Sequence, residues 1–445
     1  MQKLSIAIGL GLLSFALSAY VFDMTQAKLL GSVVFLVSLW SSEALPLGVV
    51  SLLPLLLFPA LGIVDLKGVA PNYSKPIIFL FIGGFLLAIA MQKTKLHEII
   101  ASKLMALFPQ SARGIIYALA ITSATLSAFL SNTTVTIMLM PIAMFLTQNI
   151  RLKIRYLIAT AYGASIGGIF TPIGTPPNLI LLGFLEEVGG RAPTFLEWMM
   201  LTAPVVVTMI LVVPWLLSRS VKDEPIACEI KECSLQTREQ RILSLILLAL
   251  VALLVLNAFL KPLAPQYALD EKLLLLGFGL ILFLPNVAIL EWSDTKEMPY
   301  EIVFLFGAGF AIATAFIKTG LASAIAGYFG AFAHLPLAVL LFLVALFVSF
   351  STEITSNTAL TSISLPIFYE FAKRSGIDEQ IILFTATIAA SYAFMLPIAT
   401  PPNAIIMSSR VIKIKEMAKI GFVVNLLGVV VVTLCAVGIW RYYFG

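Results

Sequence analysis

The chain has 445 residues, of which 60% are hydrophobic and only 11% are charged. A soluble domain carries about 25% charged residues, so this composition excludes a soluble enzyme and a nucleic-acid-binding domain. Many apolar runs are about 20 residues long, which is the length that crosses a bilayer core. The sequence therefore predicts an all-α polytopic membrane protein surrounded by lipid. Its net charge of +5 reflects the topology of the loops rather than a binding partner.

The apolar runs predict the spans in chain order. The first run, 4–22, lacks a small-residue cleavage site and is followed by further spans, so we expect a retained helix rather than a signal peptide. The polar linker with Cys228 and Cys233 is expected inside the cell, where thiols stay reduced and a metal site is not expected. The expected helices cover 27–42, 47–64, 76–92, 156–188, 200–218, 240–260, 272–289, 301–317, 381–408 and 418–440.

Two halves of the chain repeat one another at a constant offset. The sequence PPN begins at Pro176 and at Pro401, and SNT begins at Ser131 and at Ser356, so both pairs are 225 apart in the numbering. The segments 77–85 and 302–310 match at the same offset. A fixed period over about 100 residues indicates two copies of one unit. We expect a first helix at 1–26, one repeat at 27–219, a cytoplasmic linker at 220–239 and a second repeat at 240–445.

The two copies are expected to have opposite orientations in the membrane. Each copy has five expected spans, and its SNT stretch either dips in and returns or crosses twice, so the number of crossings is odd. Segment 93–113 has four basic residues, whereas its partner 318–334 has one. Because basic loops stay in the cytoplasm, this contrast supports inversion, with the amino terminus inside and the carboxyl terminus outside. The acidic loop 291–301 lacks the expected excess of basic residues.

Each PPN sequence interrupts an apolar helix near its middle. A proline removes an amide donor and breaks the helix, and broken helices occur in membranes where they line a cavity or are covered by protein. The freed carbonyl oxygens can coordinate sodium, and the amino terminus of the next half-helix favours an anion. The SNT sequences add hydroxyl and amide groups that suit a carboxylate or an alkali cation. The alternatives are a structural kink at PPN and interhelical hydrogen bonding at SNT.

The core segments contain few charges that could neutralise an anion. No Lys or Arg occurs in 114–150, 156–190, 319–372 or 375–409. A dianion is costly to bury alone, so helix ends and bound cations must compensate its charge, and sodium and anion should promote each other's binding. This absence predicts cation-coupled transport.

Two acidic residues and one enzyme-like motif need an interpretation. Glu353 lies three residues before Ser356 and could ligate a cation, relay a proton or hydrogen-bond to the hairpin, and Glu43 could cap or brace a helix end. The segment 163–167 fits G-x-S-x-G. The chain offers only two histidines as bases, both in loop-like segments, so close helix packing is the favoured reading and no catalytic residue is expected.

The paired SNT and PPN sequences and the stretch WSSEALP at 40–46 are similar to those of the divalent anion:sodium symporter family, over nearly the whole chain. The resemblance implies eleven spanning helices, two re-entrant hairpins, a homodimer, and a transport domain that moves like an elevator against a scaffold domain. It implies that the early helices of each copy form the scaffold, and that the stretches after Lys93 and Lys318 form interfacial arms.

The resemblance also implies ligands for each site. The first sodium site would use Ser127, Ser131, Asn132 and Gly174, and the second would use Thr352, Ser356, Asn357 and Ala399. The substrate would meet the set Ser131, Asn132, Thr133, Thr175, Ser356, Asn357, Thr358 and Thr400. Thr171 has Leu396 as its counterpart, so the two halves differ there.

The predicted function is sodium-coupled uptake of C4-dicarboxylates such as succinate, malate or fumarate across a bacterial inner membrane. The alternatives are a dicarboxylate exchanger without net sodium coupling, and a sodium-coupled carrier of citrate, 2-oxoglutarate or sulfate. A channel fits two symmetric closed sites poorly, and a membrane enzyme lacks a nucleophile–base pair. Short polar donors do not measure the length of a ligand, so the preferred anion, the sodium stoichiometry and the direction of transport stay open.

Overall fold

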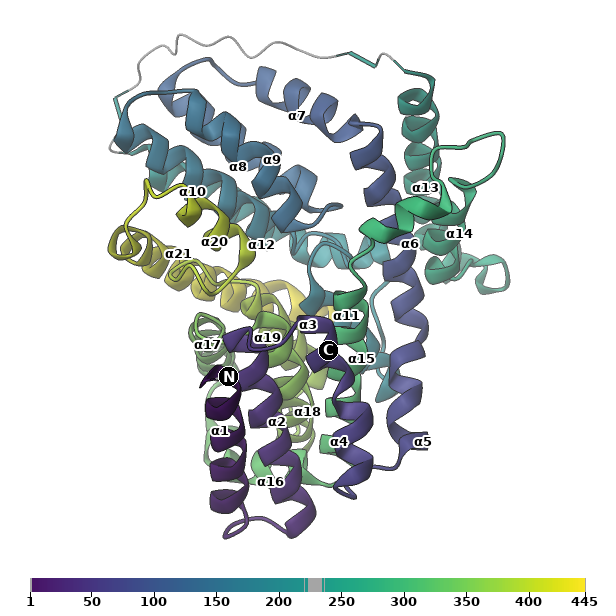
Figure 1. Ribbon diagram of the computed structural model, residues 1–445, viewed down its shortest axis with the longest axis vertical. Helices are drawn as coiled ribbons and strands as arrows, with labels where there is room; N and C mark the ends of the chain where they lie inside the picture. Colours follow the sequence, from purple (N-terminus) through teal and green to yellow (C-terminus); the bar gives the residue numbers. More distant parts are fainter. Residues whose placement is uncertain (1, 220, 223–233, 236, 445) are drawn as a thin grey trace.

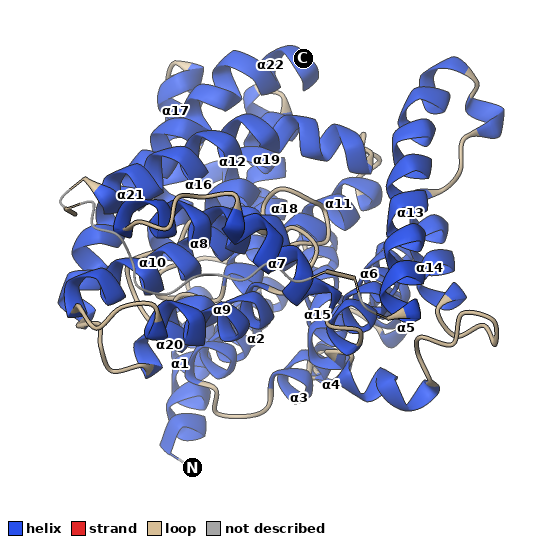
Figure 2. Cartoon of the chain, turned by 90° about the horizontal axis from the view of Figure 1, so that it is seen from above, coloured by secondary structure: helices blue, strands red, loops and turns tan. Residues whose placement is uncertain are grey.

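The computed structural model describes residues 2–219, 221–222, 234–235 and 237–444, and these residues form helices and loops without a strand (Figures 1 and 2). Six stretches of the described residues are long and apolar enough to cross a membrane. Several other expected spans are divided by prolines or by unwound links, so the expected total of eleven crossings stays a prediction. Cys228 and Cys233 lie outside the described residues.

The first helices show where proline divides an expected span. A single helix over 47–64 is wrong, because the chain forms two short helices that meet at Pro54, which has no amide to donate. α1 and α2 pack closely, since a Cβ on Gly11 would lie 2.9 Å from the Cβ of Phe35. The elements are α1 (Gln2–Ser18), α2 (Met24–Ser42), α3 (Leu47–Leu52), α4 (Pro54–Ala60), α5 (Leu66–Val69), the 3₁₀ turn Ala70–Ser74 and α6 (Pro76–Lys93).

The next helices include a hairpin and a broken helix. The expected break in 156–188 covers residues 168–175, between α10 and α11. The hairpin turns at 128–131, between α8 and α9, so the SNT sequence begins α9. The elements are α7 (Leu96–Ala106), α8 (Ala112–Ser127), α9 (Asn132–Phe145), α10 (Ile150–Gly167), α11 (Pro176–Glu187) and α12 (Phe195–Ser218).

The remaining helices again include a hairpin and a broken helix, and one of them is shorter than expected. A helix over 272–289 is wrong at its end, because α14 stops at Ile281, before Pro285, and Ala288 has a left-handed backbone (φ 48°). The second broken helix unwinds over 391–400. The elements are α13 (Arg238–Leu263), the 3₁₀ turn Pro265–Tyr267, α14 (Glu271–Ile281), the 3₁₀ turn Trp292–Glu297, α15 (Tyr300–Lys318), α16 (Leu321–Tyr328), the 3₁₀ turn Gly330–His334, α17 (Leu337–Ser351), α18 (Asn357–Ser375), α19 (Glu379–Ala390), α20 (Pro401–Ser408), α21 (Ile414–Cys435), the π turn Ala436–Trp440 and α22 (Arg441–Phe444).

The buried apolar residues form two clusters. The smaller cluster joins α1 to α5 with α15 and α16, and the larger one runs from α6 through the hairpins and the broken helices to α21. In Figure 1, α1, α2 and α16 lie at the lower end and α7 to α10 at the upper end. α15 contacts both α3 and α18. The cavity described below lies where these groups of helices meet.

Ion pairs tie the carboxyl end of α11 to its neighbours. Glu187 pairs with Lys75 at 2.6 Å, next to the start of α6, and it accepts a 2.6 Å hydrogen bond from Thr314 of α15. Glu186 pairs with Lys272 of α14 at 2.7 Å. The second half of the first broken helix is therefore fastened to three helices that lie outside the hairpins.

Candidate functional site

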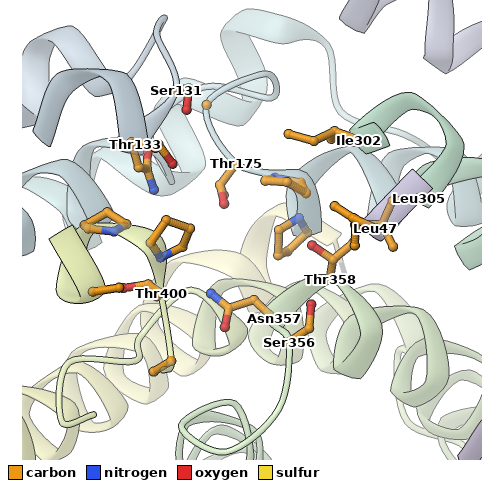
Figure 3. Close-up of a pocket in the computed structure, with 18 of the residues that line it drawn as sticks. Leu47, Ser131, Thr133, Thr175, Ile302, Leu305, Ser356, Asn357, Thr358 and Thr400 are labelled. Carbon is orange, nitrogen blue, oxygen red and sulfur yellow. The ribbon is translucent and has the colours of Figure 1, made fainter. Parts of the chain in front are cut away.

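A cavity of about 560 Å³ lies between the two hairpins and the two unwound links. Figure 3 shows Ser131, Thr133, Ser356, Asn357 and Thr358 of the two SNT sequences around this common space, together with Thr175 and Thr400 from the links before α11 and α20. The predicted residues that line it are Ser131, Asn132, Thr133, Gly174, Thr175, Ser356, Asn357, Thr358, Ala399 and Thr400. The structure thus brings together the matching segments of the two copies, and the ligand of each residue stays a prediction.

Two predicted sodium ligands lie behind the cavity wall. The Ser127 hydroxyl donates a hydrogen bond to the side-chain oxygen of Asn132, and the Thr352 hydroxyl does the same for Asn357. Both hydroxyls belong to fully buried residues, and neither residue lines the cavity. The two hydroxyls therefore orient the amides of the two SNT sequences, and the Thr352 hydroxyl also contacts the carbonyl oxygen of Ala390 at 3.2 Å. A sodium-binding role for these two residues stays a prediction.

The asparagine of each PPN sequence closes the unwound link before it. The side-chain amide of Asn178 donates to the carbonyl oxygens of Gly168 (3.2 Å) and Thr171 (2.8 Å). The amide of Asn403 donates to Ala393 and Leu396, both at 3.0 Å. These four acceptors also pair at the offset that relates the two copies. The asparagines therefore satisfy carbonyl groups that the break leaves without helical partners, a role that the sequence analysis did not assign.

Each hairpin is joined to its own unwound link by a different chemical contact. In the first copy, the Thr171 hydroxyl donates to the carbonyl oxygen of Ala128. In the second copy, the Glu353 carboxylate accepts from the amides of Met395 (2.8 Å) and Leu396 (2.9 Å). It also accepts from the Asn425 side chain at 2.6 Å. Glu353 thus acts as a hydrogen-bond acceptor, one of its three predicted roles, and its partners lie in the unwound link and in α21 rather than in the hairpin.

Four helices begin at the cavity. α9, α11, α18 and α20 start at Asn132, Pro176, Asn357 and Pro401, and all four residues line the wall. A helix amino terminus carries about half a positive elementary charge, so the four ends give the cavity a positive potential. Among the described residues of the wall, Glu43 is the one with a formal charge. The arrangement favours an anion without a neutralising Lys or Arg.

A second wall closes the cavity from the side of α2, α3, α6 and α15. Glu43 ends α2 in a left-handed conformation (φ 49°), and its amide bonds to the carbonyl oxygen of Trp40, as expected of a residue at a helix end. The position of Glu43 at the cavity was not predicted, although the polar residues inside the apolar stretch 40–46 were a signal of it. The wall residues are Trp40, Ser41, Glu43, Leu47, Phe81, Phe85, Ile302 and Leu305.

The G-x-S-x-G segment serves helix packing. A Cβ on Gly163 would lie 2.4 Å from the carbonyl oxygen of Ala120, and one on Gly167 would lie 2.1 Å from that of Ala124. α10 therefore contacts the backbone of α8 directly, as the sequence predicts. The expected loop-like position of His97 is wrong, because His97 lies buried in the first turn of α7, where its Nδ1 is 2.8 Å from the carbonyl oxygen of Met91.

Comparison of the sequence with known proteins shows that it is similar to membrane transporters. A family profile described as "Citrate transporter" (CitMHS) matches residues 37–389. The sodium-dependent dicarboxylate transporter SdcS of Staphylococcus saprophyticus is 30% identical over 96% of this chain and 89% of its own length. SdcS of Staphylococcus aureus is also 30% identical, over 96% of this chain and 90% of its own length.

Solved structures show likeness of fold alone. MtrF of Neisseria gonorrhoeae, from a study of antimetabolite efflux pumps, aligns with a TM-score of 0.61 at 14% identity, over 85% of this chain and 84% of MtrF. The YdaH transporter of Alcanivorax borkumensis aligns with a TM-score of 0.56 at 15% identity, over 84% of this chain and 87% of YdaH. Both structures agree with a helical polytopic membrane fold.

Proposed function

Because the chain belongs to the divalent anion:sodium symporter family of membrane transporters, we propose that it carries C4-dicarboxylates such as succinate, malate or fumarate into the cell together with sodium ions. It is a transporter and not an enzyme. The observation that carries the proposal is the cavity at which four helix amino termini meet while no Lys or Arg lines the described wall. An anion there needs cations as companions, and the sodium dependence of the relatives supports sodium.

The proposed substrate contacts follow the walls of the cavity. One carboxylate meets Asn132 and Thr133, and the other meets Asn357 and Thr358, with Thr175 and Thr400 between them. The first sodium site uses Ser127, Ser131, Asn132 and Gly174, and the second uses Thr352, Ser356, Asn357 and Ala399. The position of Gly168 supports the first set, because it shows that two of the proposed ligand oxygens lie close together. A Cβ built on Gly168 would lie 2.7 Å from the Asn132 side-chain oxygen and 3.2 Å from the Gly174 carbonyl oxygen.

The proposed movement is that of an elevator between two inverted repeats. The hairpins, the broken helices, α12 and α21 form the moving transport domain, and the early helices of each copy form the scaffold and the contact of a homodimer. Matched backbone conformations in the two copies support the repeat: Thr175 (φ −147°, ψ 144°) and Thr400 (φ −142°, ψ 148°) are nearly identical. Lys95 (φ 56°) and Gly320 (φ 69°) both turn the chain into the arm helices α7 and α16.

The proposed setting is the bacterial cytoplasmic membrane, with the amino terminus inside and the carboxyl terminus outside. The test is uptake of labelled succinate into proteoliposomes with and without an inward sodium gradient. We expect uptake that saturates with succinate and rises steeply with sodium. Uptake that ignores the gradient, together with obligatory counterflow in preloaded vesicles, would select an exchanger instead.

Citrate is the second candidate substrate, because the matching family profile carries that description. A competition panel with citrate, 2-oxoglutarate and sulfate separates these anions from C4-dicarboxylates in the same vesicles. Stronger inhibition by citrate than by succinate or malate would overturn the choice of substrate without affecting sodium coupling.

A further inference from the structure

A second hollow, separate from the central cavity, lies where α10 begins, α12 ends and α21 begins. Its volume is about 460 Å³. The three helices are neighbours, since α12 contacts both α10 and α21 (Figure 1). The residues that line it are Arg155, Leu216, Arg219, Lys419, Ile420 and Val423. None of them lines the central cavity.

Three cationic side chains therefore share one hollow without an acidic partner among the described residues. The ion pairs among the described residues involve other lysines and arginines, not these three. The Arg219 guanidinium lies over the ring of Trp215, 5.2 Å from its centre. Like charges held close together repel one another, so the arrangement favours an anion that bridges Arg155, Arg219 and Lys419.

The apolar side of the hollow faces the surroundings of the protein. The apolar part of its lining, here called the floor, consists of Leu216, Ile420 and Val423. Val423 is 43% exposed, and the adjoining Trp215 and Phe422 are 51% and 46% exposed. Large apolar residues at this exposure are expected to face lipid in a membrane protein, and tryptophan marks the border between hydrocarbon and headgroups. The hollow thus combines a cationic rim with an apolar, lipid-facing floor.

We propose that this hollow binds an anionic phospholipid, with its phosphate on Arg155, Arg219 and Lys419 and its acyl chain along Leu216, Ile420 and Val423. Basic pockets between membrane helices on the cytoplasmic side suit such headgroups. A soluble phosphate would use the rim alone and leave the apolar floor uncovered. The side of the membrane follows the proposed orientation, in which the starts of α10 and α21 are cytoplasmic, and the site stands whichever anion the central cavity carries.

The repeat places no matching charges on the other half of the chain. The offset between the copies takes Arg155 to Gln380 and Arg219 to Phe444, and Lys419 corresponds to Thr194. The architecture that the two copies share therefore does not require this cationic cluster. Its presence on one side alone fits a role set by the lipids of one leaflet.

The test is a titration of the purified full-length protein with phosphatidylglycerol or phosphatidylcholine, with bound lipid counted by native mass spectrometry. We expect a clear preference for phosphatidylglycerol. The triple variant Arg155→Gln, Arg219→Gln, Lys419→Gln should lose this preference by roughly two orders of magnitude, since each basic side chain contributes about fivefold to binding.

The matched control removes three charges from the same two helical starts outside the hollow, with Arg151→Gln, Lys413→Gln and Lys415→Gln, and it should bind as the unmodified protein does. The charge-preserving pair Arg155→Lys, Arg219→Lys should keep the preference, and size-exclusion profiles check that every variant is folded. Equal loss in the triple variant and in the control would overturn the proposal in favour of diffuse surface charge. Displacement of the lipid by equimolar glycerol phosphate would overturn it in favour of a soluble phosphate site.

Discussion

Replacing Glu353 tests how the second hairpin is held to its unwound link. The carboxylate is 3% exposed and accepts three hydrogen bonds, from the amides of Met395 and Leu396 and from the Asn425 side chain. Hydrogen bonds to a charged group contribute about 1.5–3 kcal/mol each. Part of this sum is offset by the desolvation of the buried carboxylate, so we expect Glu353→Ala to lower the free energy of unfolding by roughly 3–5 kcal/mol.

Two further variants allow the losses in the free energy of unfolding to be ranked. Glu353→Gln keeps one oxygen for Met395 and Asn425 but turns an NH₂ group toward the Leu396 amide, which should cost about 1–3 kcal/mol. Thr171→Val removes the single neutral hydrogen bond to Ala128 in the first copy, which should cost about 1 kcal/mol. The largest loss should therefore follow Glu353→Ala and the smallest Thr171→Val.

The assay is thermal unfolding of the detergent-purified variants at one scan rate, because membrane proteins often unfold irreversibly. Sodium dependence of uptake is the second readout: Ala399, the proposed sodium ligand, lies three residues after Leu396, so a loosened link should raise the sodium concentration for half-maximal uptake. Glu353→Ala with unchanged unfolding and unchanged sodium dependence would refute the reasoning. A greater loss in Thr171→Val than in Glu353→Ala would refute the comparison between the copies.

Three other predictions concern the cavity and its fastening. Asn132→Ala and Asn357→Ala should each abolish succinate uptake in proteoliposomes while the protein still elutes as a folded species, and near-normal uptake in both would contradict the proposed site. Gly174→Ala should raise the sodium requirement, because its Cβ would lie 2.4 Å from a backbone oxygen; unchanged sodium dependence would show that the link adapts. The double variant Glu186→Gln, Glu187→Gln should change the uptake rate no more than a few-fold, since partly exposed ion pairs contribute about 0.2–1 kcal/mol each, and raising the salt concentration should mimic it in the unmodified protein.

The sequence predicted the neighbourhood of the cavity because paired polar motifs in an apolar chain have few other places to lie. PPN and SNT recur at a constant offset, and helices broken by proline must be covered or line a cavity. Those two facts were enough to expect a binding site at the PPN links and the SNT sequences, and the family resemblance implied that both sequences contribute to the same sodium and substrate sites. The breaks in 156–188 and 381–408 followed from the same prolines.

The contacts between distant segments could not be read from the sequence. Asn178 and Asn403 close the links because the backbone there leaves particular carbonyl groups free, and which groups are free depends on the three-dimensional path. Glu353 meets Asn425, which is 72 residues away in the chain. The end of α14 was missed because an apolar run continues through 282–284 after the helix has stopped.

The two prolines at the start of α11 and of α20 also affect how many backbone amides lack a hydrogen-bond partner when no substrate is bound. An ordinary helix begins with four amides that lack partners inside the helix, and each would need a partner in a dry site. Pro176 and Pro177 have no amide hydrogen, and the Asn178 amide bonds to the Thr175 carbonyl oxygen at 3.2 Å. The electric field of the helix attracts an anion, yet few donors are left exposed after release. A transporter must release its substrate and return empty once in every cycle. The prolines that interrupt its helices therefore also reduce the number of unpaired backbone amides in the empty form.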